Sequence, residues 1–286
     1  MEKPIMAKFT IDAMQKILMQ HQIEMSYYVD RLHVYVDSSI SYDTLQIIKN
    51  WNKNNAVMYR SLPHYPQYNK KIELYQPSQK NLIDLMNMLE CDYLINKVEL
   101  ALDYRTNNQK KLTKLRDFFD KHYVIVSNRK FSKRTKFEDT SYYHTSKNKT
   151  FVIYIDSLNR KHDLKMSLHT EYRLTGTDAV QKNGIYLIKS LVEFDHANFW
   201  SKHMNLYKPS FEKLGKSRKS YQDYTRQWYI KLGKKIWSEL NVLQNFLFFR
   251  SHNHRYQSAF LKITTIEAFE KFLNESLRQK SKKCAL

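Results

Sequence analysis

The sequence predicts an α+β protein built on a mostly antiparallel sheet with flanking helices, followed by a helical C-terminal region. Segments in which apolar and polar residues alternate recur in the first part of the chain, as in half-buried strands. Amphipathic helical segments lie between them, and strands joined by short turns are usually antiparallel neighbours. From about Gly176 the apolar residues recur every three or four positions instead. We therefore expect an α+β domain over residues 1–176 and a mainly helical region over 177–286.

The clearest strand patterns lie in LINKVELALDY and LHTEYRLTG. In the first segment Glu99 and Asp103 alternate with apolar residues, so an extended backbone places both carboxylates on one face. In the second segment His169, Glu171 and Arg173 alternate with apolar or aromatic residues in the same way. The two strands can therefore present these ionisable side chains on one surface of a sheet.

The other elements follow from the same periodicities. Ser41 is a suitable N-cap for SYDTLQIIKNW, in which the apolar residues keep helical spacing. The proline-containing segment PHYPQYNK separates two strand-like segments, AVMYRSL and KKIELYQ. In chain order we expect helices over 9–20, 41–51, from about 78, and over 109–120, and strands over 27–37, 56–62, 70–76, 94–104, 141–145, 151–155 and 165–174.

A strand-plus-helix unit occurs twice in the first domain. Both units open with an acid or amide followed by a cation, Asp30-Arg31 and Asn96-Lys97, and both strands end in an aspartate before the helix. This order predicts a weak internal duplication, which suits an antiparallel sheet with helices packed on one face. Two ordinary strands that happen to end in aspartate are the alternative.

The chain is strongly basic, with 48 Lys and Arg against 28 Asp and Glu, a formal net charge of +20 and a pI of about 9.7. When a cationic surface neutralises the phosphates of a nucleic acid, counterions are released and binding is favoured. We therefore expect nucleic acid as the partner. A basic protein that is merely soluble is the alternative. The run RKFSKRTK predicts either a loop that follows a DNA backbone or a solvated hairpin tip. The expected DNA contacts are Arg129, Lys130, Lys133, Arg134 and Lys136.

Composition argues against several classes of protein. Cys91 and Cys284 are too few for a disulfide framework or a cysteine zinc site. Four glycines and no glycine-rich phosphate loop argue against a nucleotide-driven motor or a kinase. No apolar run approaches the roughly 18 residues of a membrane span, and the start MEKPIMAKFT lacks a signal-peptide core. We therefore expect a cytoplasmic protein with no membrane partner.

The ionisable residues of the two clearest strands suit metal-dependent phosphodiester chemistry. Mg²⁺ and Mn²⁺ prefer carboxylate oxygens, and Mn²⁺ also tolerates histidine. A nucleophilic tyrosine would attack the phosphate, and Lys147 or Arg173 could stabilise the transition state. Ordinary strand residues paired with lysine or arginine are the alternative for the acids. The expected metal ligands are Glu99, Asp103, Glu171 and His169.

Three motifs, VELALD, TSYYHTSKNKTFVIYID and HTEYRL, follow one another over roughly residues 94–176. Their order resembles that of the Rep-trans type replication initiators of rolling-circle plasmids, which are related to relaxases and filamentous-phage initiators. That family has an acidic strand, a hairpin T-x-Y-x-G-S-x-K with an I-Y-x-K strand, and a strand A-R-x-E-x-R-L. The resemblance covers less than a third of the chain.

The match to the hairpin motif is partial. Thr140, Tyr142 and Lys147 stand where the family has Thr, Tyr and Lys, and the I-Y step is present in FVIYID. However, His144 replaces the hairpin glycine and Asp156 replaces the lysine that follows I-Y-x. The third strand keeps E-x-R-L but lacks the leading A-R. These departures affect the alignment of the turn and one cationic phosphate contact.

The resemblance implies a Rep nuclease-like or ferredoxin-like sheet and a replication initiator of a plasmid, phage or integrated element. Such a protein binds an origin and nicks one DNA strand through a covalent phosphotyrosine, in the presence of Mg²⁺ or Mn²⁺. It implies Tyr142 as the nucleophile, with Tyr143 and Tyr154 as alternatives. The implied partners are single-stranded and duplex origin DNA, with a host helicase and a second copy of the chain as further candidates.

Two other functions stay open at this level. A non-catalytic DNA-binding initiator or regulator would use the same sheet only to read duplex DNA and would be indifferent to chelator. An RNA-binding module with a ferredoxin-like sheet would need exposed aromatic residues on central strands. Tyr35, Tyr75 and Tyr154 are eligible for that role, although none lies in an RNP-type motif.

Overall fold

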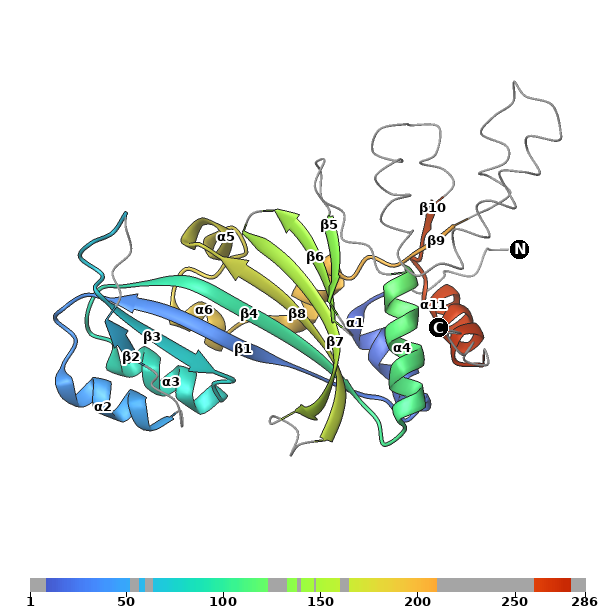
Figure 1. Cartoon of the computed structure of the whole chain (residues 1–286), viewed down its shortest axis with the longest axis horizontal. Helices are drawn as coiled ribbons and strands as arrows, with labels where there is room; N and C mark the ends of the chain where they lie inside the picture. Colours follow the sequence, from blue (N-terminus) through green and yellow to red (C-terminus); the bar gives the residue numbers. More distant parts are fainter. Residues whose placement is uncertain are drawn as a thin grey trace, which may run out of the picture.

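The computed structural model describes residues 9–51, 57–59, 64–122, 133–137, 140–146, 148–159, 165–209 and 260–278. Within these residues, eight strands form one sheet in the order β2-β3-β1-β4-β8-β7-β6-β5, and neighbouring strands are antiparallel (Figure 1). A second, two-stranded sheet pairs β9 (Tyr207–Pro209) with β10 (Phe260–Lys262). The strands of the large sheet are β1 (Glu24–Val36), β2 (Val57–Tyr59), β3 (Lys70–Tyr75), β4 (Tyr93–Arg105), β5 (Lys133–Phe137), β6 (Thr140–Ser146), β7 (Lys149–Asn159) and β8 (Lys165–Thr175).

Two groups of helices lie at the two ends of the large sheet (Figure 1). Figure 1 shows α2 and α3 beside β2 and β3 at one end, and α1, α4 and α11 grouped at the other. None of the helices in the described part of the chain combines the length and the apolar character needed to cross a bilayer. The helices are α1 (Ile11–Gln20), α2 (Tyr42–Trp51), α3 (Gln79–Met88), α4 (Gln109–His122), α5 (Thr177–Gln181), α6 (Ile188–Val192), α7 (His196–His203) and α11 (Ile266–Arg278).

The predicted α+β class, with a mostly antiparallel sheet and flanking helices, is confirmed. Two local details differ from the sequence pattern. Strand β5 begins at Lys133, inside the basic run that was expected as a loop or a hairpin tip, and basic side chains are common on edge strands because they discourage further pairing. Strands β9 and β10 lie in the region expected to be helical, because three-residue strands are too short to show a period.

The division of the chain at residue 176 and the internal duplication stay predictions. Residues 210–259, which carry most of the helical pattern expected in the second half, lie outside the described residues. In the described part, buried residues before and after position 176 belong to one hydrophobic cluster.

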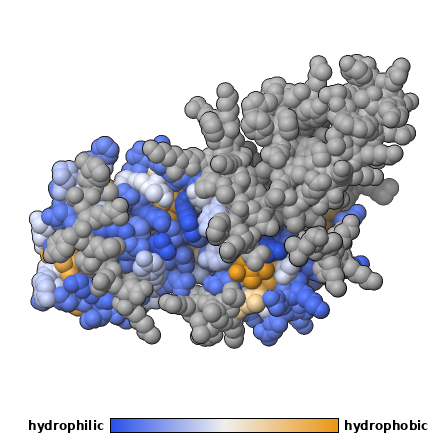
Figure 2. Space-filling model, viewed as in Figure 1, coloured by the Kyte–Doolittle hydropathy of each residue, from blue (hydrophilic) through white to orange (hydrophobic). Residues whose placement is uncertain are grey.

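The large sheet has one apolar face and one polar face. Leu100 and Leu102 of β4 contribute to the hydrophobic core, as do Phe151 of β7 and Tyr172 of β8, and helix α4 packs against β7 and β8. Helix α4 adds its buried Phe118 to this core. The alternation predicted from the sequence is therefore confirmed. Because the helices cover the apolar side, the described surface seen in Figure 2 is mainly hydrophilic with small apolar spots.

Helix α7 brings two histidines into an aromatic cluster. The ring of His203 lies 4.4 Å from that of Phe199 and 4.7 Å from that of Tyr172, and the ring of His196 lies 5.0 Å from that of Phe194. Burial lowers the pKa of both histidines to about 4. Both imidazoles are therefore neutral in the folded protein at neutral pH.

We expect the free energy of unfolding to rise as the pH increases from 4 to 6.5. The two histidines have a pKa of about 4 in the fold against an ordinary value of 6.5, so the unfolded chain binds more protons in this interval. This contribution to stability is complete above pH 6.5 and is lost as the pH falls towards 4. Urea unfolding at pH 5 and pH 7 measures the difference, which should be smaller in the double variant His196→Asn, His203→Asn. An equal pH dependence of both proteins would contradict this explanation.

Candidate functional site

Ionisable side chains from adjacent strands meet on the polar face of the sheet. The pairing of β4 with β8 sets Asp103 opposite His169 and Glu99 opposite Arg173. The residues Glu99, Asp103, His169 and Glu171 are each at most 2% exposed. Buried charges destabilise a fold unless partners neutralise them, so the contacts of these groups decide what the site can do.

Three of the polar side chains have the geometry of a metal site. Among the described residues, one ligand atom from each of Asp30, His169 and Glu171 lies within 4.8 Å of the others. Ligand atoms around one ion with bonds of about 2.1 Å lie up to roughly 4.2 Å apart, so a slight contraction would close this triad around Mg²⁺ or Mn²⁺. We call Asp30, His169 and Glu171 the acid–histidine triad.

Asp103 fixes the ring of His169 within the triad. Its Oδ1 lies 2.6 Å from Nδ1 of His169, and its Oδ2 accepts a hydrogen bond of 2.9 Å from the phenol of Tyr28. The other ring nitrogen, Nε2, is buried without a hydrogen-bond partner among the described residues and lies 3.6 Å from Oε2 of Glu171. A carboxylate on one nitrogen, with the other nitrogen left for a ligand, is the usual arrangement of a metal-binding histidine.

The charges of the triad follow from these contacts. Burial by itself lowers the pKa of His169, but the hydrogen bond with Asp103 and the neighbouring Glu171 outweigh it and raise the pKa to about 10. Burial also opposes ionisation of Glu171, yet the contacts with His169 and Arg173 lower the pKa of its carboxyl. Without a bound cation, the triad therefore holds a protonated imidazole beside an ionised carboxylate.

Glu99 lies beside the triad and is surrounded by cations. It forms an ion pair with Lys97 and lies 3.5 Å from Nε of Arg31 and 3.6 Å from Nε of Arg173. Arg173 also donates two hydrogen bonds, of 2.7 and 2.9 Å, to Glu171. Burial raises the pKa of Glu99, and the adjacent Glu171 raises it further. Glu99 is thus the centre of an ion-pair cluster that adjoins the triad.

The structure brings together all four residues that the sequence suggested as metal ligands, but in different positions. His169 and Glu171 belong to the triad, whereas Asp103 contacts the far side of His169 and Glu99 pairs with cations. The alternation of each strand predicted their common face. Their separate roles depend on which cations lie in the neighbouring strands.

Tyr142 lies two strands away from Glu171 on the same side of the sheet. It pairs with Val152 of β7, which in turn pairs with Glu171 of β8. The guanidinium carbon of Arg173 lies 6.0 Å from the centre of the Tyr142 ring. Since Arg173 also binds Glu171, this arginine connects the tyrosine with the triad.

The other two candidate tyrosines differ from Tyr142. The ring of Tyr154 lies 4.8 Å from that of His169, and burial, together with nearby acids, raises its pKa well above the ordinary value. Tyr154 therefore stays protonated and is a poor nucleophile. Of Tyr143 the structure describes the backbone, which pairs with the buried Phe151.

The basic residues that the sequence suggested as phosphate or DNA contacts fall into two groups. Lys147, Arg129 and Lys130 lie outside the described residues. Lys133, Arg134 and Lys136 lie on β5, whose backbone pairs with β6 at the edge of the sheet. The predicted role of these five basic residues of the 129–136 run in DNA binding stays a prediction.

Asp30 was not identified as a candidate ligand from the sequence. Strict alternation along β1 would place it on the apolar face with Leu32. A β-bulge between Val29 and Arg31 shifts the register against β4 and brings Asp30 to the polar face. The sequence did carry a signal, because apolar Val29 and Leu32 are three positions apart instead of two.

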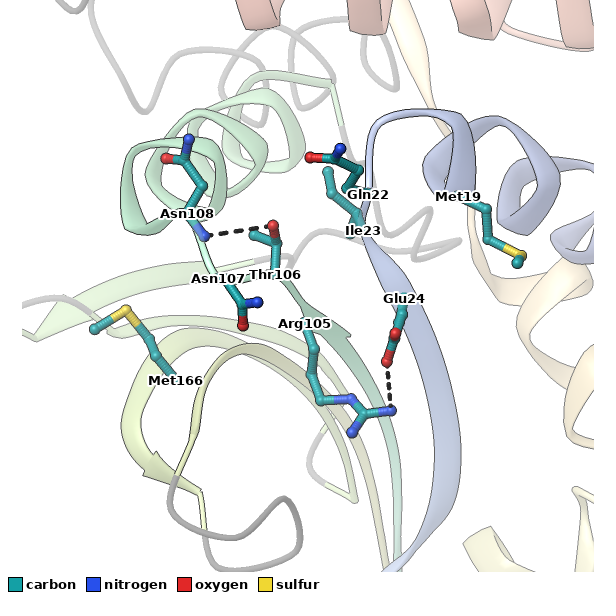
Figure 3. A pocket seen from close by; sticks show the side chains of 9 residues that line it. All are labelled: Met19, Gln22, Ile23, Glu24, Arg105, Thr106, Asn107, Asn108 and Met166. Atoms are coloured by element: carbon teal, nitrogen blue, oxygen red, sulfur yellow. Dashed lines mark hydrogen bonds and ion pairs between the residues drawn. The ribbon is translucent and has the colours of Figure 1, made fainter.

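A separate hollow of about 690 Å³ lies where β1 begins and β4 ends (Figure 3). Glu24 and Arg105 point toward each other there and form an ion pair of 3.1 Å, and Gln22 lies on its rim. No residue of the acid–histidine triad lines the hollow. It is therefore distinct from the candidate metal centre.

Comparison with known proteins gives a partial similarity to a solved structure. No protein-family model matches this chain, and no curated protein matches it. Among solved structures, the chain is similar to a rolling circle replication initiator protein from Geobacillus stearothermophilus, with 14% identity and a TM-score of 0.36. The similarity covers 56% of this chain and 78% of the other. At this TM-score the similarity carries no argument about function.

We expect the variant Asp103→Asn to be strongly destabilised. Removing one partner from a buried ion pair typically costs about 3–5 kcal/mol, because the remaining charge, here on His169, loses its nearest counter-charge and keeps only Glu171 at 3.6 Å. Urea unfolding at pH 7 measures this loss. The matched control is Asp84→Asn, which breaks an ion pair of 2.8 Å with the exposed Lys80. The control should change stability by less than about 0.5 kcal/mol, and equal losses in both variants would contradict the assigned compensation.

Proposed function

We propose that this chain is a replication initiator that binds an origin and nicks one DNA strand through Tyr142, with a divalent cation at the acid–histidine triad. The observation that carries the proposal is the position of the triad on the side of the sheet where the guanidinium carbon of Arg173 lies 6.0 Å from the centre of the Tyr142 ring. The resemblance of three successive sequence motifs to the Rep-trans type initiators supports it. We propose that the protein acts in the cytoplasm, on a plasmid, phage or integrated element.

The residues of the triad fit Mg²⁺ or Mn²⁺. Asp30 and Glu171 offer carboxylate oxygens, and His169 offers the buried Nε2 that lacks a hydrogen-bond partner among the described residues. This donor set favours Mn²⁺ or Mg²⁺ over metals that prefer thiolates. When bound, such an ion polarises a phosphodiester oxygen and stabilises the charge that develops on it.

The chain's own residues would position the reacting groups. Oη of Tyr142 forms the new bond to phosphorus while the bond from phosphorus to the 3′ oxygen breaks, which leaves a 5′-phosphotyrosine and a free 3′ hydroxyl. Arg173 lies between Tyr142 and Glu171 and would stabilise the negative charge of the transition state. Burial raises the pKa of Tyr154, which favours its protonated phenol, so this residue is better suited to donate a hydrogen bond to a phosphate oxygen than to act as the nucleophile.

The proposed partner is origin DNA. The net charge of +20 supports binding to a polyanion, and the basic residues of the 129–136 run would contact its backbone. A host helicase and a second copy of the chain are the further partners that the family resemblance implies.

We expect a covalent protein–DNA adduct that depends on Tyr142. Labelled single-stranded fragments that cover the gene for this chain and its flanks are incubated with the full chain and Mn²⁺, denatured and separated by electrophoresis. Tyr142→Phe should reduce adduct formation by several orders of magnitude, since it removes the nucleophilic oxygen. Tyr143→Phe is the matched neighbouring control and should retain most of the activity.

Chelation provides the second arm of this experiment. EDTA should abolish the adduct and added Mn²⁺ should restore it. DNA binding that is retained without any adduct, in the presence and in the absence of EDTA, would favour a non-catalytic DNA-binding initiator instead. An adduct that persists in a triple Phe variant at positions 142, 143 and 154 would rule out all three tyrosines.

A further inference from the structure

We infer that Gln76 is a positioning residue that holds the Asp30 carboxylate toward His169 and Glu171 and thereby sets the affinity of the triad for a divalent cation. The inference rests on the proposed function, because it concerns the same candidate metal centre. It assigns a role to a residue that neither the sequence motifs nor the predicted ligand set contains.

Gln76 contacts Asp30 twice. Its side-chain Nε2 donates a hydrogen bond of 3.0 Å to Oδ1 of Asp30, and its backbone N–H donates one of 2.7 Å to the carbonyl oxygen of Asp30. The backbone bond fixes the position of Asp30, and the side-chain bond fixes the rotation of its carboxylate. The carboxylate held in this way has one oxygen within 4.8 Å of a ligand atom of His169 and of Glu171.

Asp30 needs such support because the sheet ladders do not supply it. In the pairing of β1 with β4, Asp30 is the extra residue of the bulge between Val29 and Arg31 and has no register partner. The pairing of β1 with β3 ends at Arg31, opposite Tyr75. Gln76 is the next residue after Tyr75, so its two hydrogen bonds reach Asp30 just beyond the end of the β1–β3 ladder and at the bulge of the β1–β4 ladder.

The backbone of Gln76 is unusual in a way that fits this role. Its φ of 47° lies in the left-handed region, which is unfavourable for residues other than glycine and persists where other contacts compensate. Helix α3 fixes the chain on the other side, because Ser78 and Asn81 form a capping box two residues later. Gln76 is therefore held between the end of β3 and the start of α3.

A neutral amide is well suited to this task. His169 is held by Asp103, and Glu171 is held by Arg173, whose positive charge partly offsets that of the carboxylate. Gln76 holds Asp30 in turn, and because its amide is uncharged, it adds no positive charge beside this carboxylate. Residues that orient metal ligands in this way typically change metal affinity by about 10- to 100-fold when they are removed.

Two substitutions separate the side-chain role from the backbone conformation. Gln76→Ala removes the amide, whereas Gln76→Gly removes the amide and also relieves the left-handed φ. Binding of Mn²⁺ to the full-length protein is measured by isothermal titration calorimetry, and thermal stability is measured in parallel. We expect both variants to bind Mn²⁺ about 10-fold more weakly than wild type, with Gln76→Gly as stable as wild type or more stable.

Gln22→Gly is the matched control. Gln22 is the other non-glycine residue with positive φ in the described part of the chain, at 59°, and it lies beside the hollow of Figure 3 and away from the triad. This control should keep wild-type Mn²⁺ affinity. A purely structural role of Gln76 would leave the Mn²⁺ affinity of a stably folded Gln76→Gly unchanged, and that result would overturn the inference.

Asp30→Asn distinguishes failure of the inference from failure of the proposed function. Loss of Mn²⁺ binding in this variant supports the triad on which the inference depends. Wild-type binding that is unaffected by Asp30→Asn would overturn the inference and leave a metal site elsewhere for the nicking reaction. Absence of Mn²⁺ binding in the wild-type protein would overturn the metal centre of the proposed function as well.

Discussion

Charge compensation between neighbouring strands is the constraint on which the polar face of this sheet depends. Its buried carboxylates come from β3, β4 and β8, and each contacts a cation or a histidine on its own strand or a neighbouring one. An unpaired carboxylate at this depth would be protonated or would unfold the sheet. The compensating contacts run across the sheet in the order Lys71, Glu73, Arg31, Glu99, Arg173, Glu171, His169, Asp103 and Tyr28.

The acid–histidine triad is the place where this compensation is incomplete. One ring nitrogen of His169 is buried without a hydrogen-bond partner among the described residues, and Asp30 contacts a neutral amide of Gln76. By contrast, arginine or lysine contacts Glu73 and Glu99 directly, and within the triad Arg173 contacts Glu171. A cation bound at the triad would add positive charge beside Asp30, which no lysine or arginine contacts directly among the ion pairs of the described residues.

Periodicity in the sequence predicted the fold class and the common face of the site residues, because the pleat of a strand forces its side chains to alternate. For this reason Glu99 and Asp103 were correctly expected on one side of β4. Periodicity could not predict which of the acids pairs with a cation, since that pairing depends on the register between strands that are distant in sequence. The sequence did not predict Asp30 as a ligand because a bulge reverses the alternation along β1. It did not predict the role of Gln76 because that role depends on the turn that follows β3.

The order of the strands has a consequence for the synthesis of the protein. Strand β8 lies between β4 and β7, although it is made after both of them. Until β8 emerges from the ribosome, the edges of β4 and β7 that pair with β8 in the folded protein have no partner strand. Open edges of this kind can pair with other chains, so nascent copies would benefit from a chaperone during translation of residues 106–164.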